Sequence, residues 1–224
     1  MPSLSTIVET TLSPVIRPAR TEDAPFIARN ILPSQRGPKP RGWFDIALGW
    51  PEPQCVAFVE RIAVAKQKSW WHVSNFIVAE VDGEPAASLC ALPAAGTGVA
   101  ARAAIAEVAA QVGLNESELV AISRRGAYTS NCWVQGGEGE WLLEHVATLP
   151  AYRGRGLVQA LIEHALEQGR AAGFKQASIS FLIGNDAAER SYAKAGFVFA
   201  EEKRDPDFEA LTGAPGFRRF VRAI

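Results

Sequence analysis

The feature that most constrains the fold of this chain is an apolar run of strand length that turns through glycines into an amphipathic helix. Residues 141–148 (WLLEHVAT) form the run, and Pro150 ends it. The glycine-rich turn 152–156 (YRGRG) follows, and the apolar spacing of residues 157–172 predicts a helix. Residues 177–183 then alternate largely between apolar and polar side chains, which predicts another strand. This order of strand, turn, helix and strand indicates a mixed α/β fold.

Composition places the chain among ordinary globular proteins. Of its 224 residues, 48% are hydrophobic and 21% are charged. A chain of this size buries enough apolar surface to fold without disulfide or zinc crosslinks. The length favours one domain over two. We therefore expect a loose lead-in over residues 1–14 and a single domain over residues 15–224.

Local patterns predict further helices and strands along the chain. Helical apolar spacing, short alternating or apolar runs, and clusters of glycine and proline predict helices, strands and loops respectively. In chain order these are a strand at 15–20, a helix beginning at Thr21, an ordered aromatic-rich loop at 32–53, a helix at 55–68, a hairpin of strands 76–81 and 86–92 around the Asp82-Gly83 turn, a helical insertion over 94–139 with helices at 99–112 and from Asn115, a helix at 186–195 and a last strand at 217–221.

Charge and residue usage argue against several classes of function. The 23 Lys and Arg are balanced by 24 Asp and Glu, so the chain lacks the basic field that nucleic-acid binding needs. Its most apolar segment, residues 85–114, is interrupted by charges and glycines and predicts no membrane span. The three cysteines and three histidines lack the spacing of a metal site. We expect a cytoplasmic protein, a monomer or homodimer, with no nucleic-acid, membrane or metal partner.

The glycine turn itself has two interpretations. Backbone N–H groups at the start of the following helix, together with the positive end of its dipole, favour an anion there. Gly154 and Gly156 would let a phosphate approach the main chain, and Arg153 and Arg155 would add charged hydrogen bonds. The alternative is an ordinary strand-to-helix turn with two surface arginines. The turn contains neither the nucleoside triphosphatase loop nor the full dinucleotide-binding motif.

Two blocks of sequence carry a resemblance to a known family. Residues 146–157 (VATLPAYRGRGL) resemble the acyl-CoA loop of the GCN5-related N-acetyltransferase (GNAT) superfamily, written [QR]-x-x-G-x-[GA] after a strand that ends in proline. Arg153 and Gly156 match that motif, and Val158 stands at its last position, where the family has Gly or Ala. Residues 185–197 (NDAAERSYAKAGF) are similar to the family's N-x-x-A-x-x-x-Y-x-x-x-G-F element.

The resemblance implies a fold and an activity. The fold is a single-domain mixed α/β structure with a central twisted mixed sheet flanked by helices, and here with a helical insertion before the cofactor-binding strand. The activity is transfer of an acetyl group from acetyl-CoA to a primary amine of a small molecule, amino acid or peptide, by direct attack in a ternary complex. A non-catalytic acyl-CoA-binding regulatory module is the alternative.

Residues for acetyl-CoA follow from the matched motifs. The resemblance implies that backbone groups of the strand before the turn bind the pantetheine arm as an added strand would, and that the turn and helix start bind the diphosphate. Asn185 binds the same arm, or else it only caps a helix. The implied cofactor-binding residues are Val146, Ala147, Thr148, Arg153, Gly154, Arg155, Gly156, Leu157, Val158 and Asn185.

Two residues are candidates for catalysis. An alkyl amine of pKa ~10.4 is only about 0.04% neutral at pH 7, so a group that takes its proton is valuable. The resemblance implies such a base on the strand before the turn, and Glu144 is the candidate, acting directly or through a water. In regular alternation His145 points to the opposite face of the strand, so only one of the two residues should reach the site. His145 is the alternative candidate for the base. Tyr192 matches the family's tyrosine near the thioester sulfur. The structural alternatives are a Glu144–arginine pair and a core tyrosine.

The acceptor site is less constrained. In the family the first helices and their loop cover the substrate, which implies Trp43 and Phe44 here, although either aromatic could simply belong to the core. The insertion could form a second wall or an oligomer contact. The tail 205–216, with Asp207 and Glu209, either presents carboxylates to a cationic substrate or is a solvated loop.

Overall fold

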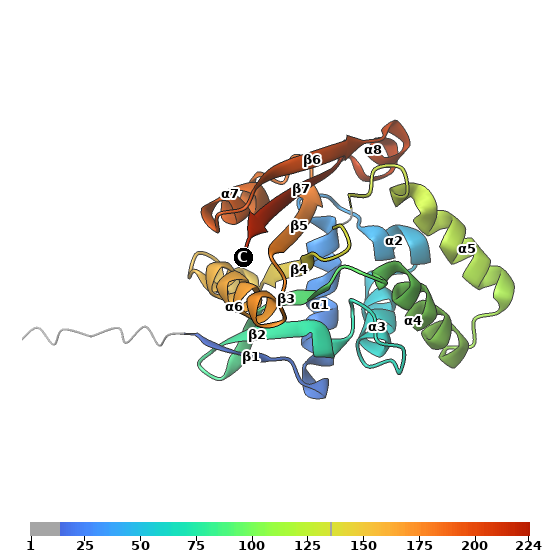
Figure 1. Cartoon of the computed structure of the whole chain (residues 1–224). Coiled ribbons are helices and arrows are strands. Elements are labelled where there is room, and N and C mark those ends of the chain that lie inside the picture. Colours follow the sequence, from blue (N-terminus) through green and yellow to red (C-terminus); the bar gives the residue numbers. More distant parts are fainter. Residues whose placement is uncertain (1–13, 135) are drawn as a thin grey trace, which may run out of the picture.

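The fold is built on one mixed sheet (Figure 1). The computed structural model describes residues 14–134 and 136–224, so all of the predicted lead-in except Pro14 lies outside the described residues. Seven strands pair in the order β1-β2-β3-β4-β5-β7-β6, antiparallel except between β4 and β5. The strands are β1 (Val15–Pro18), β2 (Phe76–Val81), β3 (Glu84–Pro93), β4 (Trp141–Thr148), β5 (Gln176–Leu182), β6 (Val198–Arg204) and β7 (Gly216–Ala223).

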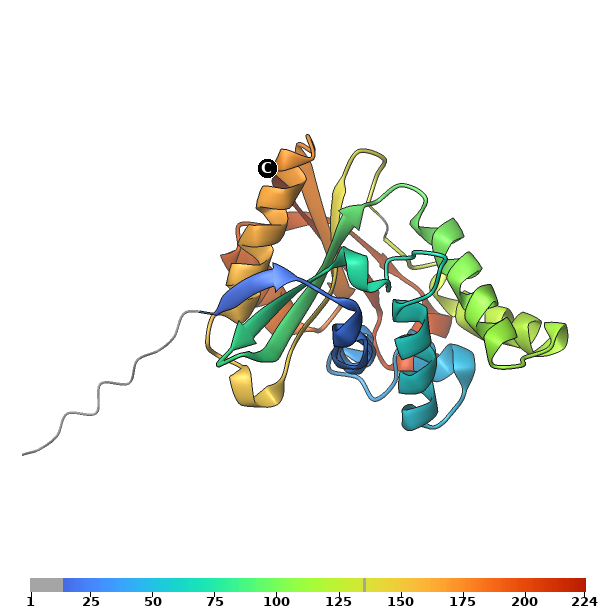
Figure 2. The same cartoon turned by 90° about the horizontal axis from the view of Figure 1, so that it is seen from below.

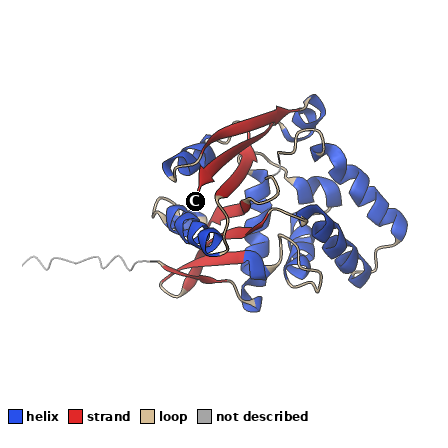
Figure 3. Cartoon of the chain, in the orientation of Figure 1, coloured by secondary structure: helices blue, strands red, loops and turns tan. Residues whose placement is uncertain are grey.

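Helices cover both faces of the sheet (Figures 2 and 3). The helices are α1 (Ala24–Arg36), α2 (Trp43–Leu48), α3 (Glu52–Ala63), α4 (Thr97–Gln111), α5 (Glu116–Gly126), α6 (Leu157–Ala171), α7 (Asp186–Lys194) and α8 (Pro206–Thr212). One buried cluster joins α1 to α4 with one face of β2–β4, and a second joins α6 and α7 with the other face. The predicted mixed α/β class is confirmed.

The sheet opens in its middle. The parallel pair β4–β5 is hydrogen-bonded in register only from Trp141 to Leu143. Residues 144–148 continue to pair with β3 on their other side. The edge of β4 that faces β5 therefore carries unpaired backbone groups over its second half. Unpaired strand edges accept an added extended chain.

A bulge in β4 changes which side chains share a face. Cys90 is opposite Glu144, whereas Ser88 is opposite Ala147, so β4 contains one extra residue between these pairs. His145 occupies the irregularity with φ of 51°, a conformation that few non-glycine residues adopt. The expectation that regular alternation separates Glu144 from His145 is wrong, because the extra residue turns both toward the face covered by α1.

Two short helices replace segments that the sequence predicted as loops. Within 32–53, α1 continues through Pro33 and α2 forms between Gly42, whose N–H donates to Asp45 at 2.7 Å, and Gly49, which has φ of 70°. In the tail 205–216, α8 begins where Asp205 accepts the N–H of Phe208 at 2.8 Å. Their caps, rather than an apolar period, define such short helices.

Other local predictions are confirmed. Strands β2 and β3 join through Asp82 and Gly83, with φ of 55° and 82°, as a two-residue hairpin with two left-handed positions requires. The predicted capping box forms at α5, where Asn115 and Glu118 exchange side-chain-to-backbone bonds of 3.0 and 2.8 Å. None of the described helices is long and apolar enough to cross a membrane.

Candidate active site

A cleft of about 1170 Å³ runs across the opening between β4 and β5. Its floor is the second half of β4, and its walls come from α1, α4, α7, β5, β6, α8 and the loops that join them. Of the residues singled out from the sequence, ten line it, namely Trp43, Glu144, His145, Val146, Ala147, Thr148, Arg153, Val158, Asn185 and Tyr192. Residues far apart in the sequence thus meet on one surface.

Glu144 presents an uncompensated carboxylate to the cleft. Its Oε1 is buried, and the carboxylate has no hydrogen bond or ion pair among the described residues. Burial raises the pKa of Glu144 to about 8, because desolvation disfavours the charged form. The alternative of a Glu144–arginine pair does not occur in the described part of the chain. A carboxyl group with a pKa near the working pH is suited to accept and release a proton.

His145 lies beside Glu144 in a defined tautomer. The hydroxyl of Ser34 donates to the carbonyl of Ile31 at 2.6 Å, so its oxygen accepts from Nδ1–H of His145 at 3.3 Å. The Nε2 of His145 is then the unprotonated nitrogen, and it is buried with no partner in the described chain. Burial lowers the pKa of His145 to about 3. The ring is a neutral acceptor that holds a proton poorly.

Tyr192 lies across the cleft on α7. Its ring packs at 5.5 Å from that of Phe181 on β5, and its side chain is 7% exposed. Burial and the charge of Glu144 raise the pKa of Tyr192, so the hydroxyl keeps its proton. No hydrogen bond to that hydroxyl is found among residues 14–134 and 136–224. Tyr192 is thus both a packed residue and an available donor.

The unpaired edge of β4 borders the same cleft. Val146, Ala147 and Thr148 line it, and the Oγ1 of Thr148 is buried with no partner among the described residues. An extended arm with amide groups would complete the interrupted strand pairing here. These residues fit the pantetheine arm of an acyl-CoA.

The glycine turn leads into the N-terminus of α6. Gly154 and Gly156 have φ of 78° and 76°, and a Cβ added at either would meet no atom within 4 Å. The space beside their backbone is therefore open, and the first N–H groups of α6 have no acceptor within the helix. Arg153 lines the cleft, whereas the guanidinium of Arg155 lies over the ring of Tyr152 at 5.2 Å. Such a helix start fits a diphosphate.

Leu157 and Asn185 have additional structural roles. The side chain of Leu157 is buried in the core below α6, so only its backbone can face a ligand. Asn185 lines the cleft and also caps α7, because its Oδ1 accepts the N–H of Ala188 at 3.2 Å. Both interpretations of Asn185 are compatible with this geometry.

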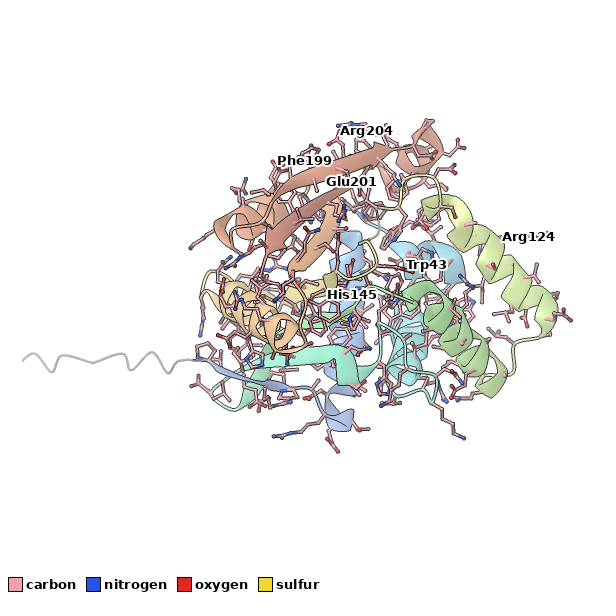
Figure 4. All side chains as sticks on the ribbon, viewed as in Figure 1. Trp43, Arg124, His145, Phe199, Glu201 and Arg204 are labelled. Atoms are coloured by element: carbon pink, nitrogen blue, oxygen red, sulfur yellow. The ribbon has the colours of Figure 1, made fainter. Side chains whose placement is uncertain are left out.

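One wall of the cleft is aromatic. Trp43 lines it and stacks on Trp71 with ring centroids 6.0 Å apart, and Figure 4 places Trp43 and His145 in the central part of the molecule. Phe44 is fully buried behind these rings and does not line the cleft, so it supports Trp43 and Trp71 and has no surface for a substrate there.

Segment 94–139 forms a wall of the cleft. Side chains from α4, from the turn after α5 and from the loop before β4 line it, including Arg102, Tyr128 and Trp133. Of the two alternatives for this segment, a second wall is what the structure describes. Asp207 and Glu209 are exposed on α8 and are not among the lining residues.

Sequence reasoning missed several lining residues. Trp70, Trp71 and Trp133 were indistinguishable from core tryptophans, and Ser34 had no signal that linked it to His145. The lining cations Arg41, Arg102 and Lys203 come from three segments far apart in the sequence. Among the described residues, no group of three or more His, Cys, Asp or Glu side chains is placed to hold a metal ion.

Comparison with solved structures gives the same architecture. A protein described as an acetyltransferase superposes with a TM-score of 0.66 at 20% identity, covering 94% of this chain and 99% of that one. An N-acetyltransferase from Staphylococcus aureus Mu50 gives 0.67 at 22% identity, with 93% and 100% coverage. A polyamine N-acetyltransferase from Drosophila melanogaster gives 0.53 at 14% identity, with 94% and 100% coverage. These likenesses show a shared fold.

Comparison of sequences identifies the family. A search of curated protein sequences finds no significant match. The profile of the acetyltransferase (GNAT) family matches residues 41–197, which include α2, the cleft-lining part of β4, the glycine turn and α7. The chain therefore belongs to the acetyltransferase (GNAT) family and is an acyltransferase.

Proposed function

We propose that the protein transfers an acetyl group from acetyl-CoA to a primary amine, by direct attack of the amine on the thioester within a ternary complex. The observation that carries this proposal is the unpartnered carboxylate of Glu144, which shares one cleft with the open edge of β4. Residues 15–224 would act as one acetyltransferase domain. The family generally uses acetyl-CoA, and the cleft offers an unpaired strand edge and a helix N-terminus for it.

Glu144, His145 and the backbone of residues 146–148 have different roles in the proposed transfer. Acetyl-CoA supplies the acyl group as a reactive thioester. The carboxylate of Glu144, directly or through a water, accepts the proton that the amine must lose before or during attack. Neutral His145 accepts a hydrogen bond from the same amine and orients it, because its low pKa makes it a poor store for the proton. Backbone N–H groups of residues 146–148 bind the pantetheine arm and polarise the thioester carbonyl.

Tyr192 completes the scheme as a donor to the departing sulfur. We expect Tyr192→Phe to lower kcat about tenfold, within the range of general acid catalysis, while the Kd for acetyl-CoA changes less than about threefold. The reason is that the substitution removes only the hydroxyl and keeps the ring against Phe181. Tyr152→Phe is the control, since Tyr152 does not line the cleft. Equal kcat values for Tyr192→Phe and Tyr152→Phe would assign Tyr192 to packing alone.

The proposed reaction is tested by thiol release. Acetyl-CoA is mixed with the protein and a panel of primary amines that includes alkylamines, free amino acids and short peptides, and free CoA is titrated as it forms. We expect amine-dependent release and a mass increase of one acetyl group on the amine. Calorimetry with CoA alone tests the cofactor site separately. Tight CoA binding with no release for any amine would contradict the proposed transfer and favour a regulatory acyl-CoA-binding module.

A further inference from the structure

The acceptor side of the cleft is rich in cations and poor in acids. The cationic side chains that line the cleft are Arg29, Arg41, Arg102, Arg153 and Lys203. Glu144 is the only acidic residue among the described residues that line it. Arg153 belongs to the glycine turn proposed for the diphosphate. Arg41, Arg102 and Lys203 come instead from the loop before α2, from α4 and from β6, and in Figure 1 α4 and α6 lie on opposite sides of the sheet centre.

Arg41, Arg102 and Lys203 make few hydrogen bonds or ion pairs with the described part of the chain. Neither Arg41 nor Arg102 makes a hydrogen bond or ion pair with the described part of the chain. Asp45 lies close enough to feel the charge of Arg41, but it is already held by Arg36 through two bonds of 2.6 and 2.8 Å. Lys203 makes one hydrogen bond of 3.3 Å, to the carbonyl of Trp133. Cationic side chains that line one cleft and have no acidic partner in the described chain attract an anionic ligand group.

Aromatic rings separate Lys203 from His145 and Glu144. The ring of Trp70 lies 6.4 Å from that of His145, and the ring of Trp133 lies a further 5.9 Å from Trp70. Lys203 reaches the carbonyl of Trp133. The surface from Glu144 to Lys203 therefore passes over two apolar rings. A ligand that contacts both ends needs an apolar spacer between its amine and its anionic group.

Two indole donors lie buried in the same aromatic wall. The indole Nε1 atoms of Trp70 and Trp71 are buried with no hydrogen-bond partner among the described residues, and both residues line the cleft. Trp71 is 3% exposed. An indole nitrogen can only donate, and a buried donor without an acceptor is costly. These nitrogens are shielded from the cleft by their own rings, and the indole nitrogen of Trp141, which does not line the cleft, is likewise without a partner in the described chain.

We propose that the acceptor is a primary amine that carries an anionic group beyond an apolar spacer. Its amine faces Glu144, its apolar part lies on Trp70 and Trp133, and its carboxylate or phosphate is bound by Arg41, Arg102 and Lys203. The identification of this ligand as an acceptor rests on the proposed acetyl transfer. A polyamine, in contrast, would place its second cation beside these three.

Matched amines that differ in one anionic group test this inference. The first pair is 4-(2-aminoethyl)benzoate and its benzamide, and the second is tyramine O-phosphate and tyramine. The Kd of each is measured with CoA-saturated protein from the fluorescence of the cleft tryptophans, and kcat/KM from thiol release. In at least one pair, we expect the amine that carries the carboxylate or phosphate to bind at least tenfold tighter than the amine that lacks it. One charged hydrogen bond provides a difference of this size. The pair with the larger ratio distinguishes a carboxylate from a phosphate acceptor.

The variant Arg102→Gln, compared with a matched control, tests whether the preference for amines with an anionic group arises in the cleft. Arg102 is exposed on α4 and lines the cleft, whereas Arg124 is exposed on α5, does not line it, and lies at the outer side of the molecule in Figure 4. Both substitutions remove one positive charge from an exposed helix position. The preference is the Kd of the amine without the anionic group divided by the Kd of the amine that carries it. We expect Arg102→Gln to reduce this ratio about tenfold and Arg124→Gln to leave it unchanged.

The outcomes separate this inference from the proposed reaction. Equal Kd values within both pairs, or the same ratio in Arg102→Gln and Arg124→Gln, would overturn the inference, even if both amines are acetylated. A tenfold preference in Kd that Arg102→Gln removes would support an anion-binding site in the cleft, even if no amine is acetylated. In that case only the proposed transfer fails.

Discussion

Replacing Glu144 by glutamine is expected to lower kcat by about 10²- to 10⁴-fold, the range typical of losing a general base. The amide has nearly the same shape as the carboxyl group but cannot take the proton of the amine. Because Glu144 makes no hydrogen bond or ion pair with the described residues, the substitution breaks no internal contact, and the Kd for CoA should stay within about threefold. The measurement is kcat from thiol release at saturating amine, beside CoA calorimetry.

The pH dependence gives this prediction a second readout. Burial raises the pKa of Glu144 from its ordinary 4.5 to about 8, so the carboxylate fraction, and with it kcat/KM, should rise as pH increases through about 8. An acceptor amine of low pKa keeps its own titration out of this range. Glu144→Gln should lack the rise. The same slope in wild type and variant would show that another group is the base.

Stability can be separated from catalysis in the same variant. The folded chain binds the Glu144 proton more tightly than the unfolded chain does. The contribution of this group to the free energy of unfolding is therefore greatest below about pH 4.5 and is lost as the pH rises through about 8. The neutral amide avoids that loss. The Tm of Glu144→Gln at pH 8 should therefore be no lower than that of wild type. Glu167→Gln, on the exposed face of α6, should leave both kcat and Tm unchanged.

Gly156→Asp is expected to raise the Kd for acetyl-CoA about 100-fold or more. A carboxylate at this position would face the diphosphate at the N-terminus of α6, and two like charges about 4 Å apart repel by a few kcal/mol near a protein surface. Calorimetry with CoA measures the effect without any need for an acceptor. Unchanged affinity would refute the assignment of the turn.

Two matched variants isolate charge from backbone strain. Gly156 has φ of 76°, so any side chain there is somewhat strained, although it would meet no atom within 4 Å. Asparagine tolerates this conformation about as well as aspartate and is neutral, so Gly156→Asn should raise Kd less than tenfold. Gly173 has φ of 90° and equally open surroundings at the other end of α6. Gly173→Asp should leave the Kd for CoA unchanged.

Much of the fold followed from local patterns. The glycine turn before α6, the Asp82-Gly83 hairpin and the capped start of α5 at Asn115 are each specified by residues close together in the sequence. Backbone geometry and short-range capping bonds determine them. The cleft-lining positions of Glu144 and Tyr192 were likewise indicated by motifs, while their chemical roles stay predictions.

The features that escaped prediction depend on contacts between distant segments. The bulge at His145 exists only in the register between β3 and β4, and no residue near it in sequence marks it. The hydroxyl of Ser34 selects the tautomer of His145 from a helix more than a hundred positions earlier. Arg41, Arg102 and Lys203 line the cleft from three separated segments. Apolar periodicity carries no information on such partners.

The extra residue in β4 also limits how this strand can evolve. Deleting His145 would leave one residue in each strand between the Cys90–Glu144 and Ser88–Ala147 pairs, so the ladder would become regular with both pairs kept. The deletion would remove the second side chain that the irregularity places in the cleft beside Glu144. Point changes at 145 are constrained as well, because a β-branched residue resists the left-handed backbone that His145 adopts. A single irregular position thereby brings the side chains of two consecutive residues, Glu144 and His145, to one cleft.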